Sequence, residues 1–155
     1  MRRAARTPRT RALVSALRNA DAIVVGSPGY HGGVSGLLKN AIDYVEEMAN
    51  DYLPYFSGKP VGCVATALGW QGCTSNLQAL RCIVHSLRGW STPLGIALNT
   101  KDTSFDETGV CINSDLAIQV DLMTERLLMM CQPHHDRWGT FIDAQPRPQT
   151  SATVE

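Results

Sequence analysis

Two kinds of apolar pattern run along the chain, and each predicts a different element. Continuous apolar runs without alternation are typical of strands buried on both faces of a parallel sheet. Such runs occupy Ala22 to Val25, Val61 to Thr66 and part of Leu94 to Leu98. We therefore predict three buried strands.

Four other segments have the spacing of amphipathic helices, with apolar residues three or four positions apart. They are predicted over residues 8–19, from Leu37 to about Asn50, from a capping Thr74 or Ser75 to about Arg88, and from a capping Ser114 onward. Helices that alternate with strands favour a parallel sheet between two helical layers, joined by right-handed crossovers. The predicted class is α/β, a three-layer sandwich.

The stretch from Asp21 to Asp43 combines a buried strand, a glycine-rich loop and a helix. Ser27 to Gly36 is predicted to be the loop, because its glycines and Pro28 interrupt both periods. A second such loop, Ala67 to Cys73, follows the second strand. In open parallel sheets, ligands bind beyond the carboxyl ends of the strands, where both loops emerge.

Both loops combine glycines with flat side chains. Glycine lets backbone N–H groups approach a ligand closely, and Tyr30, His31 and Trp70 offer planar surfaces. A planar polar heterocycle fits this chemistry. Tight turns between strand and helix also need glycine for geometry alone, so that alternative stays open. The Walker A, GxGxxG and GxSxG patterns are all absent.

Composition favours one soluble domain over residues 1–135 and a disordered tail over residues 136–155. The 155 residues are 44% hydrophobic and 18% charged, with 14 basic and 14 acidic side chains, so whole-chain charge does not favour nucleic acid. No apolar run approaches the roughly 18 residues that span a membrane. Five cysteines without metal-ligand spacing indicate free thiols, no metal site and the cytoplasm. The Arg-rich start is either an exposed helix face with a frayed end or a transit peptide.

One sequence motif indicates a particular protein family, which the chemistry of its residues alone does not. Ser27-Pro28-Gly29-Tyr30-His31-Gly32-Gly33-Val34-Ser35-Gly36-Leu37-Leu38-Lys39-Asn40-Ala41-Ile42-Asp43 closely resembles the flavin loop and following helix of the NADPH-dependent FMN reductase family, which is flavodoxin-like. Gly58 to Val61, Thr66 to Gly72 and Leu80-Arg81 fall where that family has its next strand, second flavin loop and helix. The resemblance covers roughly residues 8–132.

The resemblance implies an FMN site with two walls and no catalytic side chain. One wall would be Pro28, Gly29, Tyr30, His31 and Gly32; the other would be Thr66, Ala67, Leu68, Gly69, Trp70, Gln71 and Gly72. It further implies NADPH or NADH as the hydride donor, a small-molecule electron acceptor, and a homodimer or homotetramer.

Three departures from the family pattern qualify this expectation. Gly29 replaces a residue that is often acidic, and Gly33 replaces one that is often Ser or Thr. Members normally begin with a strand, a Gly-Ser-x-Arg phosphate loop, a helix and a second strand, none of which has a counterpart here. We therefore expect an N-terminally truncated, partial domain of about three strands and four helices, with weakened FMN binding.

The predicted function is hydride transfer from NAD(P)H to bound FMN and on to a second acceptor. Two alternatives share the flavin: a dehydrogenase of a small cyclic metabolite, and a quinone or azo reductase. An alternative of another class is a flavin-free structural or regulatory remnant.

Overall fold

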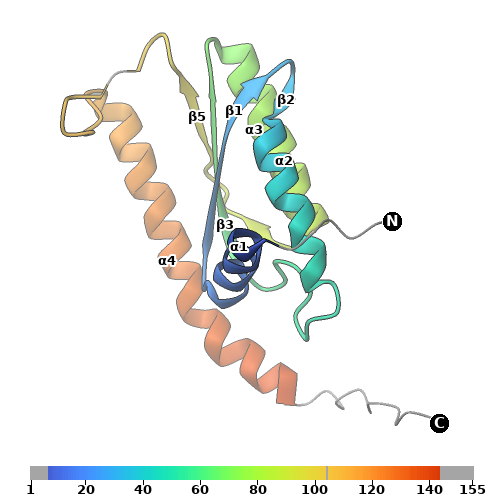
Figure 1. The fold of residues 1–155 in the computed structure, drawn as a ribbon. Coiled ribbons are helices and arrows are strands. Elements are labelled where there is room, and N and C mark those ends of the chain that lie inside the picture. The colour runs from blue at the N-terminus through green and yellow to red at the C-terminus, as the bar shows by residue number, and fades with distance from the viewer. Residues whose placement is uncertain (1–6, 104, 144–155) are drawn as a thin grey trace.

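The computed structural model describes residues 7–103 and 105–143, with side chains described up to residue 131. Helices and strands alternate along the chain (Figure 1). The helices are α1 (Pro8–Asn19), α2 (Gly36–Asp43), the 3-10 helix η1 (Tyr44–Met48), α3 (Trp70–Ser86) and α4 (Ser114–Asp143). The strands are β1 (Ile23–Tyr30), β2 (Gly33–Val34), β3 (Pro60–Ala67), β4 (Trp90–Ser91) and β5 (Ile96–Asn99).

The sheet is mostly parallel, as predicted. β3 lies at its centre and pairs in parallel with β1 on one side and with β4 and β5 on the other. β2 adds an antiparallel partner at the end of β1. The sequence predicted three strands because β2 and β4 have two residues each, too few to form an apolar run.

Helices cover the sheet on two faces (Figure 1). Because side chains alternate along a strand, neighbouring residues of β3 face opposite layers. A side chain at Gly62 would meet Met123 and Leu127 of α4. Val61 instead belongs to the main core, together with Leu80 and Val84 of α3. The three-layer α/β architecture is confirmed.

Helix α1 begins as predicted, with Thr7 as the N-cap and Pro8 in the first turn. The Thr7 side chain accepts a hydrogen bond from the backbone N–H of Thr10 at 3.2 Å. Val14 is the residue of α1 that becomes fully buried. The chain then enters β1 within four residues, so the last turn of α1 lies at the amino end of the sheet.

Three predicted boundaries outside the candidate site are wrong. The helix after the first loop is α-helical only to Asp43 and continues as η1. The side chain of Asn113, not Ser114, caps α4 by accepting from Leu116 N–H at 3.1 Å. α4 also continues to Asp143, so residues 136–143 are helical where a tail was predicted; the rest of that tail, residues 144–155, lies outside the described residues. Within the described part of the chain, no helix is long and apolar enough to cross a membrane.

Candidate functional site

The first predicted loop is largely a β-hairpin. β1 continues through Ser27 to Tyr30, which corrects the prediction that a loop begins at Ser27. The proline and glycines fit the strand because Pro28 pairs with Thr66 of β3 and Gly29 with Val34 of β2.

His31 and Gly32 form the tip of this hairpin. Their φ angles are +52° and +88°, and positive values at both central residues are typical of a two-residue type I′ turn. Glycine adopts this conformation freely, whereas a histidine in it is uncommon. The tip therefore presents His31 in a fixed, exposed position beyond the end of β1.

The second predicted loop is shorter than expected, because α3 begins at Trp70. Only Leu68 and Gly69 separate β3 from the helix, so Trp70, Gln71 and Gly72 form the first helical turn. Gly69 is the N-cap and offers no capping side chain. First-turn N–H groups have no partner inside their own helix, and the helix dipole makes this end attractive to electron-rich groups.

The structure brings the two segments into direct backbone contact. A Cβ atom at Gly29 would lie 3.1 Å from the carbonyl oxygen of Gly72 and 3.2 Å from Cβ of Asn76. A Cβ atom at Gly72 would lie 2.9 Å from Cβ of Ala67. Both glycines are needed for this close approach.

Large side chains stand around this junction and remain exposed. Tyr30 is 61% exposed at the end of β1, and Leu68 and Trp70 are 68% and 58% exposed beside α3. His31, Gly32 and Gln71 are exposed as well. Eleven of the twelve predicted residues thus form two groups, a packed backbone junction around Pro28, Gly29, Thr66, Ala67 and Gly72, and an exposed rim; the half-buried Gly69 links them.

Buried polar residues that the sequence analysis missed hold this junction. Asn76 of α3 is fully buried, and its Nδ2 donates to the Ser27 carbonyl oxygen at 2.8 Å. The backbone N–H of Ser35 donates to Ser27 Oγ at 2.9 Å. The segment after β5 also reaches this edge, since Thr100 N–H donates to the Ala67 carbonyl oxygen at 2.9 Å.

A sequence signal for two of these residues was present. Ser27 continues the buried alternation of Ile23 and Val25 along β1. Asn76 lies four residues before Leu80 and therefore on the buried face of α3. A polar residue at a core position of a regular element indicates a specific partner. The identity of that partner depends on tertiary structure.

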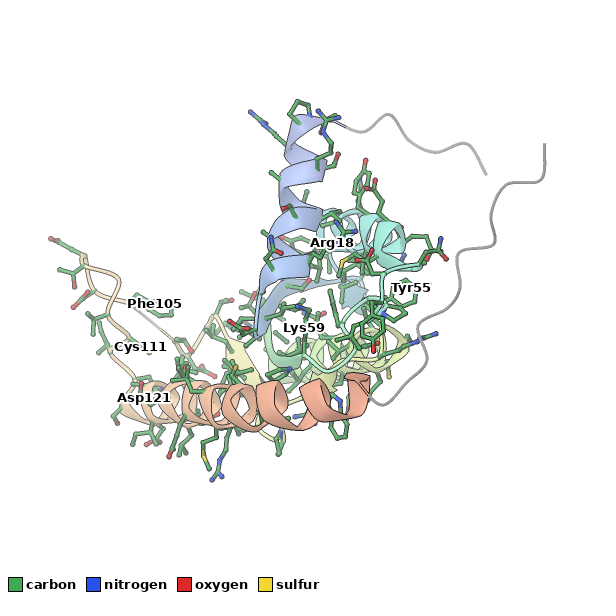
Figure 2. The ribbon with its side chains drawn as sticks, turned by 90° about the horizontal axis from the view of Figure 1, so that it is seen from below. Arg18, Tyr55, Lys59, Phe105, Cys111 and Asp121 are labelled. Carbon is green, nitrogen blue, oxygen red and sulfur yellow. The ribbon has the colours of Figure 1, made fainter. Side chains whose placement is uncertain are left out.

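Elsewhere, the segment before α4 carries exposed apolar residues. Phe105 and Cys111 form an isolated antiparallel bridge there, away from the cluster of Arg18, Tyr55 and Lys59 (Figure 2). All five cysteines are free thiols, as predicted. Burial raises the pKa of the Cys63 thiol, so it stays protonated within β3 at neutral pH.

Comparison with known proteins identifies the family. The model of the NADPH-dependent FMN reductase family matches residues 2–103, which include both segments of the site. The chain belongs to the NADPH-dependent FMN reductase family. A curated relative, the FMN-dependent NADPH-azoreductase of Staphylococcus aureus, is 37% identical over 101 residues, covering 65% of this chain and 50% of the relative. The chain thus spans about half the length of this relative.

Solved structures share the fold at low sequence identity. An oxidoreductase from Corynebacterium diphtheriae matches with a TM-score of 0.66 at 22% identity, over 82% of this chain and 64% of that one. The NAD(P)H:acceptor oxidoreductase FerB from Paracoccus denitrificans matches with a TM-score of 0.67 at 16% identity, over 84% and 71%. A WrbA-like flavodoxin from Agrobacterium tumefaciens matches with a TM-score of 0.51 at 22% identity, over 79% of this chain and 71% of that one. The fold is therefore flavodoxin-like, as expected.

Proposed function

We propose that the hairpin Pro28–Gly32 and the segment Thr66–Gly72 hold the isoalloxazine ring of FMN in an NAD(P)H-dependent flavin oxidoreductase. The observation that carries the proposal is the backbone contact at Gly29 and Gly72, at the carboxyl edge of the sheet. It keeps two strand ends side by side at the edge of the sheet where a ligand would bind. A ring with polar edges suits such a surface, because backbone groups both donate and accept hydrogen bonds.

The residues present fit the polar ring of this cofactor. The start of α3 offers N–H groups and the positive end of a helix dipole, and its first turn contains no acidic residue to oppose an electron-rich ligand. Tyr30 and Trp70 supply exposed flat surfaces on the two sides of the junction, where a second reactant would stack beside the ring. Bound FMN would supply the redox chemistry, which is acceptance of a hydride from NADPH or NADH and its transfer to a second acceptor.

The chain's own task is to bind and orient, so no catalytic acid or base is assigned. Holding two reactants in contact is by itself a large contribution to rate. The hairpin and the start of α3 orient the ring through backbone groups, and the exposed rim receives the second reactant. An aromatic azo compound or quinone is the proposed acceptor, supported by the name of the Staphylococcus aureus relative and by the aromatic rim.

We further propose a homodimer or homotetramer in the cytoplasm. The exposed apolar side chains Leu37, Leu53 and Tyr52 on and after α2 support an interface, because large apolar residues are otherwise costly to expose. Size-exclusion chromatography with light scattering tests this; a strictly monomeric protein across the micromolar range would contradict it.

Titration of FMN with purified protein, followed by flavin fluorescence, tests the site. We expect quenching at micromolar protein, about tenfold weaker for Gly29→Val because the new side chain meets the Gly72 carbonyl oxygen. Gly36→Ala is the matched control, since Gly36 has open space around it and lies in a helix. Absence of quenching by the parent protein would refute FMN binding.

Oxidation of NADPH or NADH in the presence of FMN and an azo dye then tests the reaction. Consumption of the nicotinamide cofactor that depends on FMN supports the oxidoreductase. If the protein binds flavin but does not consume NADPH or NADH, it is a flavin-binding protein without the proposed activity.

A further inference from the structure

Asn76 is a buried polar residue on a helix face that otherwise belongs to the core. It is fully buried, like Leu80 one turn later and Val84 after that. Asparagine is a poor helix former, and its amide loses hydration on burial. A residue with these disadvantages indicates a specific requirement at this position.

The Asn76 amide connects α3 to the base of the hairpin. Its Nδ2 donates to the Ser27 carbonyl oxygen at 2.8 Å. Ser27 Oγ donates to the Pro28 carbonyl oxygen and accepts from Ser35 N–H, both at 2.9 Å. Ser35 Oγ in turn caps α2 by accepting from Leu38 N–H at 3.2 Å. The amide therefore begins a continuous path of hydrogen bonds through both ends of the hairpin.

The same residue also fixes the spacing between the two walls of the proposed site. A Cβ atom at Gly29 would lie 3.2 Å from Cβ of Asn76, so Gly29 packs directly against it. Asn76 belongs to the helix that starts at Trp70, and it follows the second wall by one turn. One side chain thus ties the second wall to the base of the first.

The oxygen of the same amide, Asn76 Oδ1, is buried and has no hydrogen-bond partner in the described part of the chain. An unpaired buried acceptor is costly, so removing Oδ1 favours stability, whereas removing Nδ2 takes a donor from the Ser27 carbonyl and opposes it. Stability alone therefore does not account for the amide. The hydrogen bond from Nδ2 to the Ser27 carbonyl oxygen accounts for an amide at this position.

We infer that Asn76 is a positioning residue of the flavin site: its Nδ2–H holds the Ser27 carbonyl, and with it the hairpin Pro28–Ser35, in register with the start of α3. This inference rests on the proposed FMN site. Leu is close to Asn in size and has no donor, so Asn76→Leu separates the hydrogen bond from packing.

The first test compares FMN affinity and thermal unfolding in Asn76→Leu and in Thr92→Val. Thr92 is also buried and donates to the Leu94 carbonyl oxygen, but it follows β4, away from the hairpin. We expect Asn76→Leu to weaken FMN binding about tenfold, with a change in Tm no larger than that of Thr92→Val, which also loses one buried hydrogen bond. Thr92→Val should leave FMN affinity unchanged. Parent-like affinity in Asn76→Leu, or an equal loss in Thr92→Val, overturns the inference.

Asn76→Asp provides a pH signature that a packing role would not give. The protonated carboxyl can donate its O–H to the Ser27 carbonyl, whereas the carboxylate cannot. Burial raises the pKa of such a carboxyl above its ordinary value of about 3.9. FMN affinity of this variant should therefore approach the parent value at low pH and fall as pH rises through that pKa. An affinity ratio to the parent that stays constant with pH overturns the inference.

Amide hydrogen exchange in the absence of FMN separates this inference from the proposed function. Residues 29–33 should exchange faster in Asn76→Leu than in the parent, while residues 61–65 of β3 should not change. If the parent shows no flavin quenching, the FMN proposal fails but faster exchange at residues 29–33 still supports the positioning role. Equal exchange at residues 29–33 in the two proteins overturns it.

Discussion

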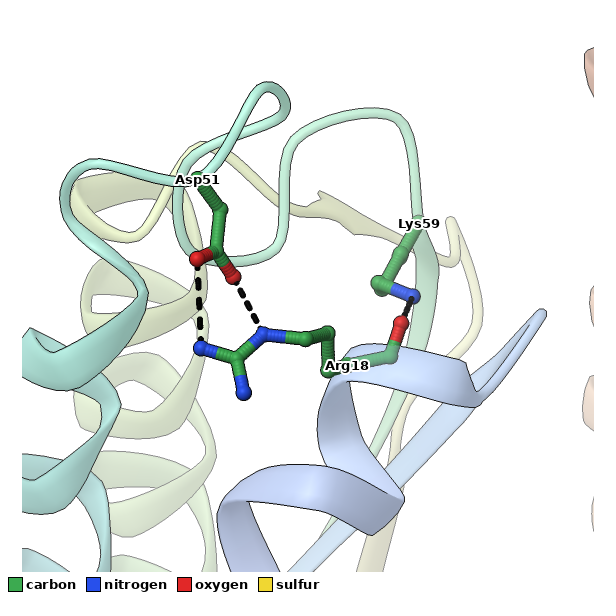
Figure 3. Close-up of polar contacts among 3 residues, drawn as sticks. All are labelled: Arg18, Asp51 and Lys59. Carbon is green, nitrogen blue, oxygen red and sulfur yellow. Dashed lines mark hydrogen bonds and ion pairs between the residues drawn. The ribbon is translucent and has the colours of Figure 1, made fainter.

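The two ends of the sheet are held together by different kinds of contact. At the amino end, long side chains join α1 to the segments before β3. Lys59 Nζ donates to the carbonyl oxygens of Arg18, at 3.0 Å, and of Ala20, which closes the last turn of α1. Arg18 also pairs with Asp51 through two contacts, Nε to Oδ2 at 2.6 Å and Nη2 to Oδ1 at 3.1 Å (Figure 3).

At the carboxyl end, two backbone segments touch, and they can do so because glycine has no side chain. Gly29 and Gly72 bring the hairpin against the first turn of α3, and Asn76 holds them from the interior. Side chains at the amino end join elements of the fold, whereas glycines at the carboxyl end allow the close backbone contact of the proposed flavin site. The comparison predicts that substitutions at the two ends affect different measurements.

Gly72→Val should have the largest effect and should act on ligand binding. Even a Cβ atom at this position would lie 2.9 Å from Cβ of Ala67, so α3 or β3 must shift. Overpacking of this kind costs roughly 1 to 3 kcal/mol. We expect FMN affinity to fall up to about 100-fold, measured by fluorescence quenching. An FMN affinity equal to that of the parent would show that the junction tolerates side chains. The proposed difference between the two ends of the sheet would then be wrong.

Lys59→Met should act on stability instead. It removes a charged donor from two carbonyl oxygens, which should lower the free energy of unfolding by about 2 kcal/mol. Urea unfolding followed by circular dichroism measures this change. FMN affinity should stay within about twofold of the parent. A large loss of FMN affinity in a folded Lys59→Met protein would contradict the separation of the two ends.

The pH dependence of stability gives a second test at Lys59. Burial lowers the pKa of this lysine in the folded protein, so the unfolded chain binds its proton more tightly. The free energy of unfolding contributed by Lys59 therefore rises with pH between the lowered pKa and the ordinary value of about 10.4. Lys59→Met should lack this increase. An identical pH profile in the two proteins would contradict the lowered pKa of Lys59.

The same contrast explains how much the sequence could predict. The main strands and all four α-helices were predictable because each has a repeating apolar pattern of its own. The start of α3 was not, since Gly69 carries no capping side chain and the helix begins without a signal. Ser27 to Tyr30 was misassigned because proline and glycine usually end a strand, whereas here pairing with β3 and β2 supports them.

The residues of the candidate site follow from the family motif, but their arrangement does not. The family motif identifies Pro28 to Gly32 and Thr66 to Gly72, yet no local pattern shows that Gly29 touches Gly72. The Asn76 to Ser27 hydrogen bond joins residues 49 positions apart. Contacts of this range depend on tertiary structure, which a single sequence without an alignment does not reveal.

Trp70→Ala tests whether the exposed rim and the backbone junction have different roles at the carboxyl end. Trp70 is exposed and begins α3, so its side chain contributes little to the core. Aromatic pairs contribute about 0.5 to 1.5 kcal/mol beyond buried area. We expect KM for an aromatic acceptor to rise about fivefold, with FMN affinity nearly unchanged. An equal loss of FMN affinity would place Trp70 on the flavin itself.

The ion pair between Arg18 and Asp51 should have the smallest effect, although its geometry is bidentate. The two side chains are 44% and 28% exposed, and pairs in water contribute only about 0.2 to 1 kcal/mol. A double-mutant cycle of Arg18→Ala and Asp51→Ala should give a coupling energy of about 0.5 kcal/mol that decreases with added salt. The Lys59 contact would persist in both variants, because it uses the Arg18 backbone carbonyl. A coupling that salt does not change would mean that the pair is shielded from solvent and belongs to the rigid amino end rather than to its surface.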